Sequence, residues 1–212
     1  VFDLVRALGA RQGEVEGNVL WVGTLARPAQ NTRLQSAWAP ELEWAFVDNH
    51  AIEVEVPITD LDVEGVKVAA QGTLLVGDPS TPWHHDSTTL GWQLIAEYAH
   101  DLKGAFITPL MLAGYRLGDA LSVLIMAGVE VFSNGDGVGM QAIANPSFFA
   151  DLAETLTAGI ETNLRLGDSS SARLVPQVHW QLWRHMRIQL GAGLTLAPGG
   201  PYPLLSSRLI VE

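Results

Sequence analysis

Hydrophobic and polar residues alternate with a period of two along most of the chain. In the segment Ala120–Phe132 (ALSVLIMAGVEVF), every second residue is apolar: Leu121, Val123, Ile125, Ala127, Val129 and Val131. The intervening row contains Ser122, Leu124, Met126, Gly128 and Glu130. Because successive side chains of a strand point to opposite faces, this alternation predicts a β-strand with one wholly apolar face. The same pattern recurs over residues 172–183 and 186–197.

Turn-forming residues separate these segments at regular intervals, for example at Asp48-Asn49, Gly118-Asp119 and Asn134–Gly137. They divide the chain into twelve predicted strands, at residues 15–28, 33–46, 50–59, 64–76, 90–100, 105–117, 120–132, 138–152, 155–166, 172–183, 186–197 and 202–212. Many of these span 11–14 residues, whereas soluble strands average about 5–6 and a tilted membrane strand needs about 9–11.

The alternation alone does not distinguish a soluble barrel or sandwich from a transmembrane barrel, in which the apolar face meets lipid and the polar face lines a lumen. Two features favour the membrane. The apolar row has few Phe residues to fill a wide soluble barrel. Aromatic residues also lie near predicted strand ends, as in an interfacial girdle: Trp21, Trp44, Trp92, Tyr98, Tyr115 and Trp183.

We therefore predict an all-β fold, a single antiparallel transmembrane β-barrel of about twelve strands over residues 15–212, apolar outside and polar within. The N and C termini are both expected on the periplasmic side. Residues 1–14 would form an N-terminal periplasmic segment, in which Phe2, Val5 and Leu8 have helical spacing. A short helix and a loosely ordered terminus are equally compatible with that segment. Five prolines, including Pro109, fall inside predicted strands and require irregular pairing.

Composition narrows the function classes further. The chain has 12 Lys+Arg against 23 Asp+Glu and a net charge of −11, which argues against a nucleic-acid partner. It contains no cysteine, so disulfides, thiolate metal sites and cysteine nucleophiles are excluded. The expected partners are the lipid bilayer and either a small-molecule solute or another protein.

Charged residues occupy the polar row of most predicted strands. We expect the lumen to be lined by Glu41, Glu43, Glu53, Glu55, Lys67, Glu97, Arg116, Glu130, Glu161, Arg165, Arg173, His179, Arg187 and Arg208. With Glu16, eight glutamates face six cations. The glutamates concentrate on the early strands and the arginines on the late ones. Barrel closure should bring Arg208 near Glu16, and the remaining arginines should face Glu41, Glu43, Glu53 and Glu55 across the lumen. The electric field between these opposed charges has two possible consequences. It orients a dipolar solute along a narrow, weakly cation-preferring path, or it draws the side chains of the two walls together and closes the lumen.

The sequence predicts no catalytic site, metal or cofactor. Crowded glutamates are one way to build a general acid, but the basic residues on other strands favour a structural network. His84-His85-Asp86 is expected to be an exposed loop cluster, and His179 a member of the hydrogen-bonded network. The segment Phe132–Gly135 matches the end of the nucleophile motif of outer-membrane phospholipases. Val131 stands where that motif has its histidine, so the serine lacks its base.

Several strand segments also carry a family resemblance: residues 38–46 (WAPELEWAF), 49–57 (NHAIEVEVP), 66–72 (VKVAAQG), 91–98 (GWQLIAEY), 145–152 (NPSFFADL) and 157–163 (TAGIETN). Over residues 15–212 the chain resembles the outer-membrane β-barrels of the MetA-pathway-of-phenol-degradation or transporter-like family. The resemblance implies a Gram-negative outer-membrane protein that passes small hydrophobic or aromatic molecules. The alternative is a non-conducting barrel that anchors or sheaths a partner assembly.

Overall fold

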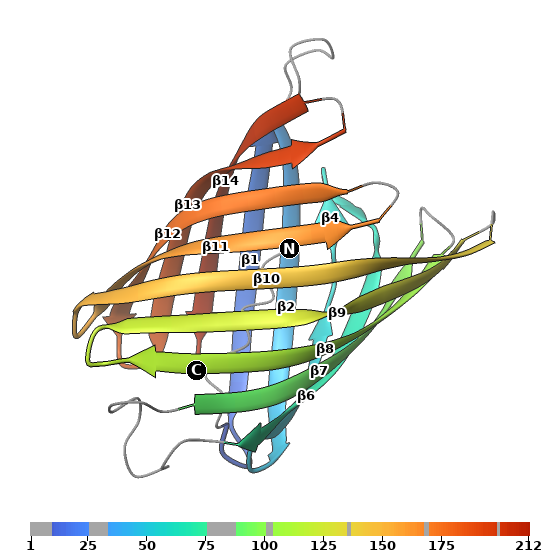
Figure 1. Ribbon diagram of the computed structural model, residues 1–212. Coiled ribbons are helices and arrows are strands. Elements are labelled where there is room, and N and C mark those ends of the chain that lie inside the picture. Colours follow the sequence, from blue (N-terminus) through green and yellow to red (C-terminus); the bar gives the residue numbers. More distant parts are fainter. Residues whose placement is uncertain are drawn as a thin grey trace.

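The structure is a computed structural model that describes residues 10–25, 34–75, 88–100, 104–134, 137–167, 170–198 and 200–212. Fourteen strands in the described residues form one continuous antiparallel sheet (Figure 1). They are β1 (Val15–Leu25), β2 (Leu34–Val47), β3 (His50–Glu55), β4 (Ile58–Thr59), β5 (Asp62–Val63), β6 (Gly65–Leu75), β7 (Thr88–Ala99), β8 (Gly104–Leu117), β9 (Leu121–Asn134), β10 (Gly137–Ala153), β11 (Leu156–Leu166), β12 (Ser171–Trp183), β13 (Met186–Ala197) and β14 (Gly200–Val211). Within this part of the chain, no helix is long and apolar enough to cross a membrane.

The sheet closes on itself because β1 pairs with both β2 and β14. Strands β3 and β4 act as a single strand interrupted at Pro57, since Glu41↔Glu55 and Ala37↔Thr59 keep the same register against β2. The two-residue strand β5 pairs with β4 in a short hairpin at the rim. Counted this way, the described residues form a closed barrel of twelve antiparallel strands, which confirms the predicted fold.

The predicted strand boundaries agree with the structure to within three residues for the described ends. The exceptions are the break of the third strand at Pro57 and the short strand β5, neither of which the alternation predicted. The start of β1 and the end of β14 lie at the same end of the barrel, where Gly17 pairs with Val211. The candidate helix at Phe2, Val5 and Leu8 and the cluster His84-His85-Asp86 lie outside the described residues.

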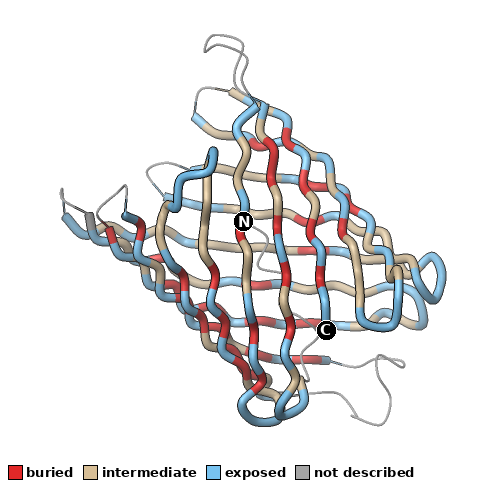
Figure 2. Tube along the Cα trace, turned by 180° about the vertical axis from the view of Figure 1, so that it is seen from behind, coloured by how far each residue is buried: buried red, intermediate tan, exposed pale blue. Residues whose placement is uncertain are grey.

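The two faces of the barrel are arranged as predicted for a membrane protein, with charge inside and apolar side chains outside. On β2, Leu42 and Trp44 are 57% and 48% exposed while Glu43 between them is 4% exposed. Figure 2 shows this alternation of buried and exposed positions along the strands. An apolar surface of this extent, built from every strand, is suited to contact lipid rather than water.

Three prolines are accommodated by local gaps in the sheet. Pro109 on β8, Pro146 on β10 and Pro176 on β12 each fall where pairing with the following strand is interrupted. The register does not shift across these gaps: on β8 pairing resumes at Leu110↔Gly128. Because proline has no N–H to donate, the ladder loses a hydrogen bond there without a change in strand alignment. The expected irregularities are therefore present.

The barrel interior also contains apolar side chains that the sequence analysis did not single out. One buried cluster comprises Leu20, Val22, Ala39, Val175 and Leu204, and a second comprises Ala69, Ile95, Leu110, Leu112 and Met126. These residues occupy inward positions of their strands, next to the charged residues. The interior is therefore a mixed core in which ions and amides alternate with packed aliphatic groups.

Candidate functional site: the charged barrel interior

Glutamates repeat along one wall of the interior. The sequence has Glu-x-Glu at residues 41–43 and 53–55, and a spacing of two places both carboxylates of each pair on the same face of a strand. The register then aligns them across strands: Glu16 lies opposite Glu43, Glu43 opposite Glu53, and Glu41 opposite Glu55. Like charges in directly opposite positions destabilise a sheet, so this acidic wall, formed by these five residues, needs cations close by.

Lys67 supplies one of these cations. It lies directly opposite Glu55 on the neighbouring strand. Its Nζ is 3.3 Å from Glu55 Oε2 and 3.8 Å from Glu53 Oε1, and all three side chains are less than 8% exposed. On its other side Lys67 lies opposite Glu97 of β7. Lys67 therefore has the carboxylates of Glu53, Glu55 and Glu97 as neighbours.

Arg208 supplies the second cation, from the strand that closes the barrel. Its Nη2 is 3.0 Å from Glu41 Oε2, and its Nε donates to Asn18 Oδ1 at 3.0 Å. Asn18 Nδ2 in turn donates to Glu41 Oε1 at 2.5 Å. Closure thus brings Arg208 to the acidic wall, but it lies opposite Leu20 and forms its ion pair with Glu41, whereas the strand order led us to expect Glu16 as its neighbour.

Carboxylate oxygens of Glu41, Glu53 and Glu55 lie within 4.8 Å of one another. Three oxygens at this spacing are a geometry that a hard cation accepts. Lys67 and Arg208 already contact all three carboxylates, so the chain itself supplies the compensating charge. The acidic wall therefore forms an ion-pair network with Lys67 and Arg208.

The later strands keep their ion pairs local. Arg165 Nη1 is 3.0 Å from Glu130 Oε1, and Gln141 also donates to Glu130. Arg116 Nη1 is 2.7 Å from Asp151 Oδ2. The expectation that the remaining arginines face the early glutamates across the lumen is not met by these two, because each pairs with a carboxylate only two strands away.

The other three predicted residues of this region also have near neighbours. Arg187 Nε donates to Gln181 Oε1 at 3.1 Å. Glu161 accepts from Asn163 and Gln177 at 3.0 and 3.2 Å. His179 packs against Phe149 with ring centroids 5.4 Å apart.

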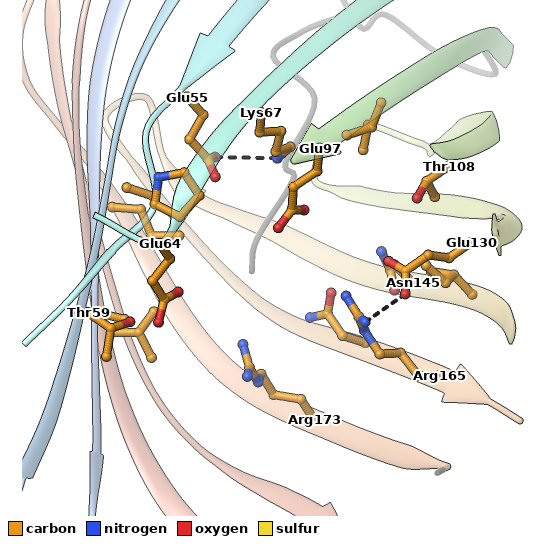
Figure 3. A pocket seen from close by; sticks show the side chains of 18 of the residues that line it. Glu55, Thr59, Glu64, Lys67, Glu97, Thr108, Glu130, Asn145, Arg165 and Arg173 are labelled. Atoms are coloured by element: carbon orange, nitrogen blue, oxygen red, sulfur yellow. Dashed lines mark hydrogen bonds and ion pairs between the residues drawn. The ribbon is translucent and has the colours of Figure 1, made fainter. Parts of the chain in front are cut away.

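The end of the barrel opposite the start of β1 and the end of β14 contains a cavity of about 340 Å³ (Figure 3). Side chains from all twelve barrel strands line it, so it is a section of the lumen and we call it the vestibule. Its charged residues are Glu55, Glu64, Lys67, Glu97, Glu130, Arg165 and Arg173, and its polar ones include Thr59, Thr108, Asn145, Asn163, Ser171, Thr195 and Tyr202. Six of the fourteen predicted lumen residues are among them.

The remaining predicted residues lie on inward positions nearer the end where β1 starts and β14 ends. There Glu43, Glu53, Glu161 and Arg208 are 3–6% exposed. Aliphatic groups elsewhere in the interior are packed as tightly, with Leu112, Val175 and Leu204 at 0–2% exposure. Side chains therefore fill the interior at these positions, and the vestibule lies above a packed section.

Sequence reasoning missed four participants in the interior: Asn18, Glu64, Asp151 and Tyr202. Asn18 is two residues from Glu16 and Asp151 lies in the inward row of its predicted strand, so the alternation contained the signal for both. Glu64 and Tyr202 stand at predicted strand starts, where it is not apparent from the sequence whether a side chain faces the lumen or the rim.

The family description HAEPLYID-like matches residues 1–200. The chain belongs to the HAEPLYID-like family. This match does not confirm the MetA-pathway family, which the strand segments resemble. No curated protein sequence matches this HAEPLYID-like chain.

Solved structures show the same fold at low sequence identity. The COG4313 outer membrane channel from Pseudomonas putida F1 has a TM-score of 0.69 at 12% identity, covering 100% of this chain and 99% of that one. A NanC porin has a TM-score of 0.67 at 6% identity, with coverages of 94% and 100%. A KdgM porin has a TM-score of 0.63 at 9% identity, with coverages of 90% and 97%. The HAEPLYID-like chain thus has the porin-like fold of outer-membrane β-barrels.

Proposed function

We propose that this HAEPLYID-like protein is an outer-membrane channel for small polar solutes in a Gram-negative bacterium. The observation that carries the proposal is the vestibule: a cavity inside a closed barrel, lined by every strand and surrounded by an apolar outer surface. Proteins that share the fold are named as porins or channels. In this proposal the vestibule opens to the cell exterior, the termini lie in the periplasm, and the barrel has no enzymatic activity.

The lining favours polar cargo. Ions, amides and hydroxyls line the vestibule beside aliphatic side chains such as Leu20 and Ile95, and transfer of an aromatic hydrocarbon past buried ion pairs would leave those ions poorly solvated. For this reason we propose polar solutes in place of the hydrophobic or aromatic compounds that the sequence resemblance implied. One related porin fold was solved with disordered oligogalacturonate, which is also a polar compound.

A second candidate function is supported by the packed section below the vestibule. Buried Glu43, Glu53 and Glu161, together with the ion pair of Arg208 and Glu41, fill the interior there. A barrel closed in this way would act as an anchor or sheath for a protein partner. For the channel function, these side chains must move when a solute passes.

Planar-bilayer recording distinguishes the two functions. A channel shows discrete conductance steps after reconstitution of the purified protein, and a sealed barrel shows none. We expect the double variant Glu53→Gln/Glu55→Gln to lower cation selectivity, because it removes two buried carboxylates from the path. Glu154→Gln, which changes an exposed carboxylate in the turn between β10 and β11, is the matched control. Unaltered selectivity in the double variant would show that these carboxylates do not line the ion path.

A further inference from the structure

Two charged side chains of the vestibule have no ion-pair partner in the described part of the chain. Arg173 on β12 has one side-chain hydrogen bond, from its Nε to Thr195 Oγ1 at 3.4 Å. Glu64, immediately before β6, uses its backbone N–H and C=O in contacts with Pro57 and His100, while its carboxylate has no bonded partner among these residues. Both side chains line the cavity.

These two groups lie on different sides of the vestibule. Figure 3 shows Glu64 and Glu97 reaching toward the cavity from one side, and Arg165 and Arg173 reaching in from the other. A direct ion pair between Arg173 and Glu64 would give each charge a partner, but the two side chains do not form one. The cavity therefore has a negative side and a positive side.

The surroundings of Arg173 suit a carboxylate ligand. Asn163 lies directly opposite Arg173 on β11, and Ser171 lies opposite Arg165. Guanidinium groups bind carboxylates through paired, charge-assisted hydrogen bonds, and neighbouring amide and hydroxyl donors extend that recognition. Arg165 is already paired with Glu130, which leaves Arg173 as the primary anion-binding group.

The opposite side suits an ammonium group. Glu64 and Glu97 belong to adjoining ends of β6 and β7, and both carboxylates line the cavity. Across the cavity, beside Glu130 in Figure 3, Asn145 offers a further neutral acceptor, because its buried Oδ1 has no hydrogen-bond partner in the described residues. A buried amide oxygen without a donor is satisfied when a ligand brings an N–H group.

We infer that the vestibule binds a small zwitterion, with its carboxylate on Arg173 and its ammonium group against Glu64. A purely anionic ligand would be repelled by the glutamate side and a purely cationic one by the arginine side, whereas a dipolar molecule matches both. A volume of about 340 Å³ lies at the lower end of small-molecule pockets, about 300–1,000 Å³, so the ligand class is that of amino acids and similarly small zwitterions. As the identity of the transported solute, this inference rests on the proposed channel function.

The test is isothermal titration calorimetry on the detergent-solubilised full chain with three matched probes: 4-aminobutyrate, butyrate and butylammonium. We expect 4-aminobutyrate to bind at least about tenfold more tightly than either singly charged probe. Arg173→Gln and Glu64→Gln should each weaken its binding by roughly ten- to a hundredfold, because each removes a charge-assisted hydrogen bond. Arg187→Gln is the control, since Arg187 lies at the other end of the barrel and does not line the vestibule.

Equal affinity for the three probes, or no binding of 4-aminobutyrate at millimolar concentration, would overturn the inference. So would unchanged affinity in both variants when they retain the folded, heat-modifiable gel mobility of the wild type. The comparison of probes on the wild-type protein needs no variant to fold. Because binding is measured without transport, a protein that binds the zwitterion but never conducts contradicts the channel alone. One that conducts but does not discriminate among the probes contradicts only the zwitterion site.

Discussion

Removal of Arg208 is the sharpest test of the interior network. We expect Arg208→Met to lower the free energy of unfolding by about 3–5 kcal/mol, the usual cost of leaving a buried charge without its partner. We expect a loss in the upper part of this range, because the side chains of Arg208 and Glu41 are 6% and 5% exposed and their closest atoms are 3.0 Å apart. Methionine keeps most of the aliphatic stem, so lost packing contributes little.

Two further variants assign the loss to the charge. Arg187→Met removes an arginine whose side chain is 38% exposed and whose nearest carboxylate, on Glu212, is 4.0 Å away. An exposed pair of this kind is worth at most about 1 kcal/mol. The double variant Arg208→Met/Glu41→Gln removes both charges of the buried pair and should regain at least half of the stability lost in Arg208→Met.

The measurement is urea unfolding of the detergent-folded barrel, followed by tryptophan fluorescence. Equal losses in Arg208→Met and Arg187→Met would refute the assignment of a buried ion pair. A double variant as unstable as Arg208→Met would show instead that lost packing, not the orphaned carboxylate, causes the effect.

Three other outcomes follow from the fold. Ile125→Arg should block barrel assembly in a folding assay, because a charge near the middle of the lipid face costs about 2–4 kcal/mol. Ser122→Asn on the inward face should assemble normally in the same assay, and equal assembly of the two variants would contradict the assignment of faces. The purified protein should require detergent and migrate at different positions on a gel before and after boiling, whereas a soluble monomer without detergent would eliminate the membrane barrel. Gly128→Ala should destabilise the barrel by about 1–3 kcal/mol in urea unfolding, since its Cβ would lie 1.9 Å from the Pro109 carbonyl oxygen; Gly17→Ala, whose Cβ meets nothing within 4 Å, is the control and should differ from it.

The barrel itself was predictable because its signal is local. Alternation over 11–14 residues fixes which side chains share a face, and turn residues mark the ends, so strand count and orientation follow from single segments. The break at Pro57 was not predictable in the same way. Proline was visible in the sequence, but whether the chain continues along β2 or turns there depends on the pairing of β4 with β2 and β5.

Pairing within the interior was less predictable, because it depends on register between strands. Inward positions were identified from the alternation, yet the partner of Arg116 is Asp151, which lies on a strand two places away in the barrel. Strand tilt and side-chain length decide such contacts. The apolar clusters around Leu110 and Leu204 were missed for a related reason: alternation places these residues on the inward face, but whether they pack together or face open lumen depends on contacts between strands.

The repeated Glu-x-Glu pairs also favour the correct register of β2 against its neighbouring strands during folding. A slip of β2 by a single residue would turn Glu41 and Glu43 toward lipid and bring Leu42 and Trp44 into the interior, because side chains alternate with a period of two. Misaligned intermediates would therefore place two carboxylates in hydrocarbon at once and separate Glu41 from Arg208 on the closing strand. The acidic wall thus disfavours barrels in which β2 is misaligned by one residue, because such barrels have a higher free energy before the last strand closes.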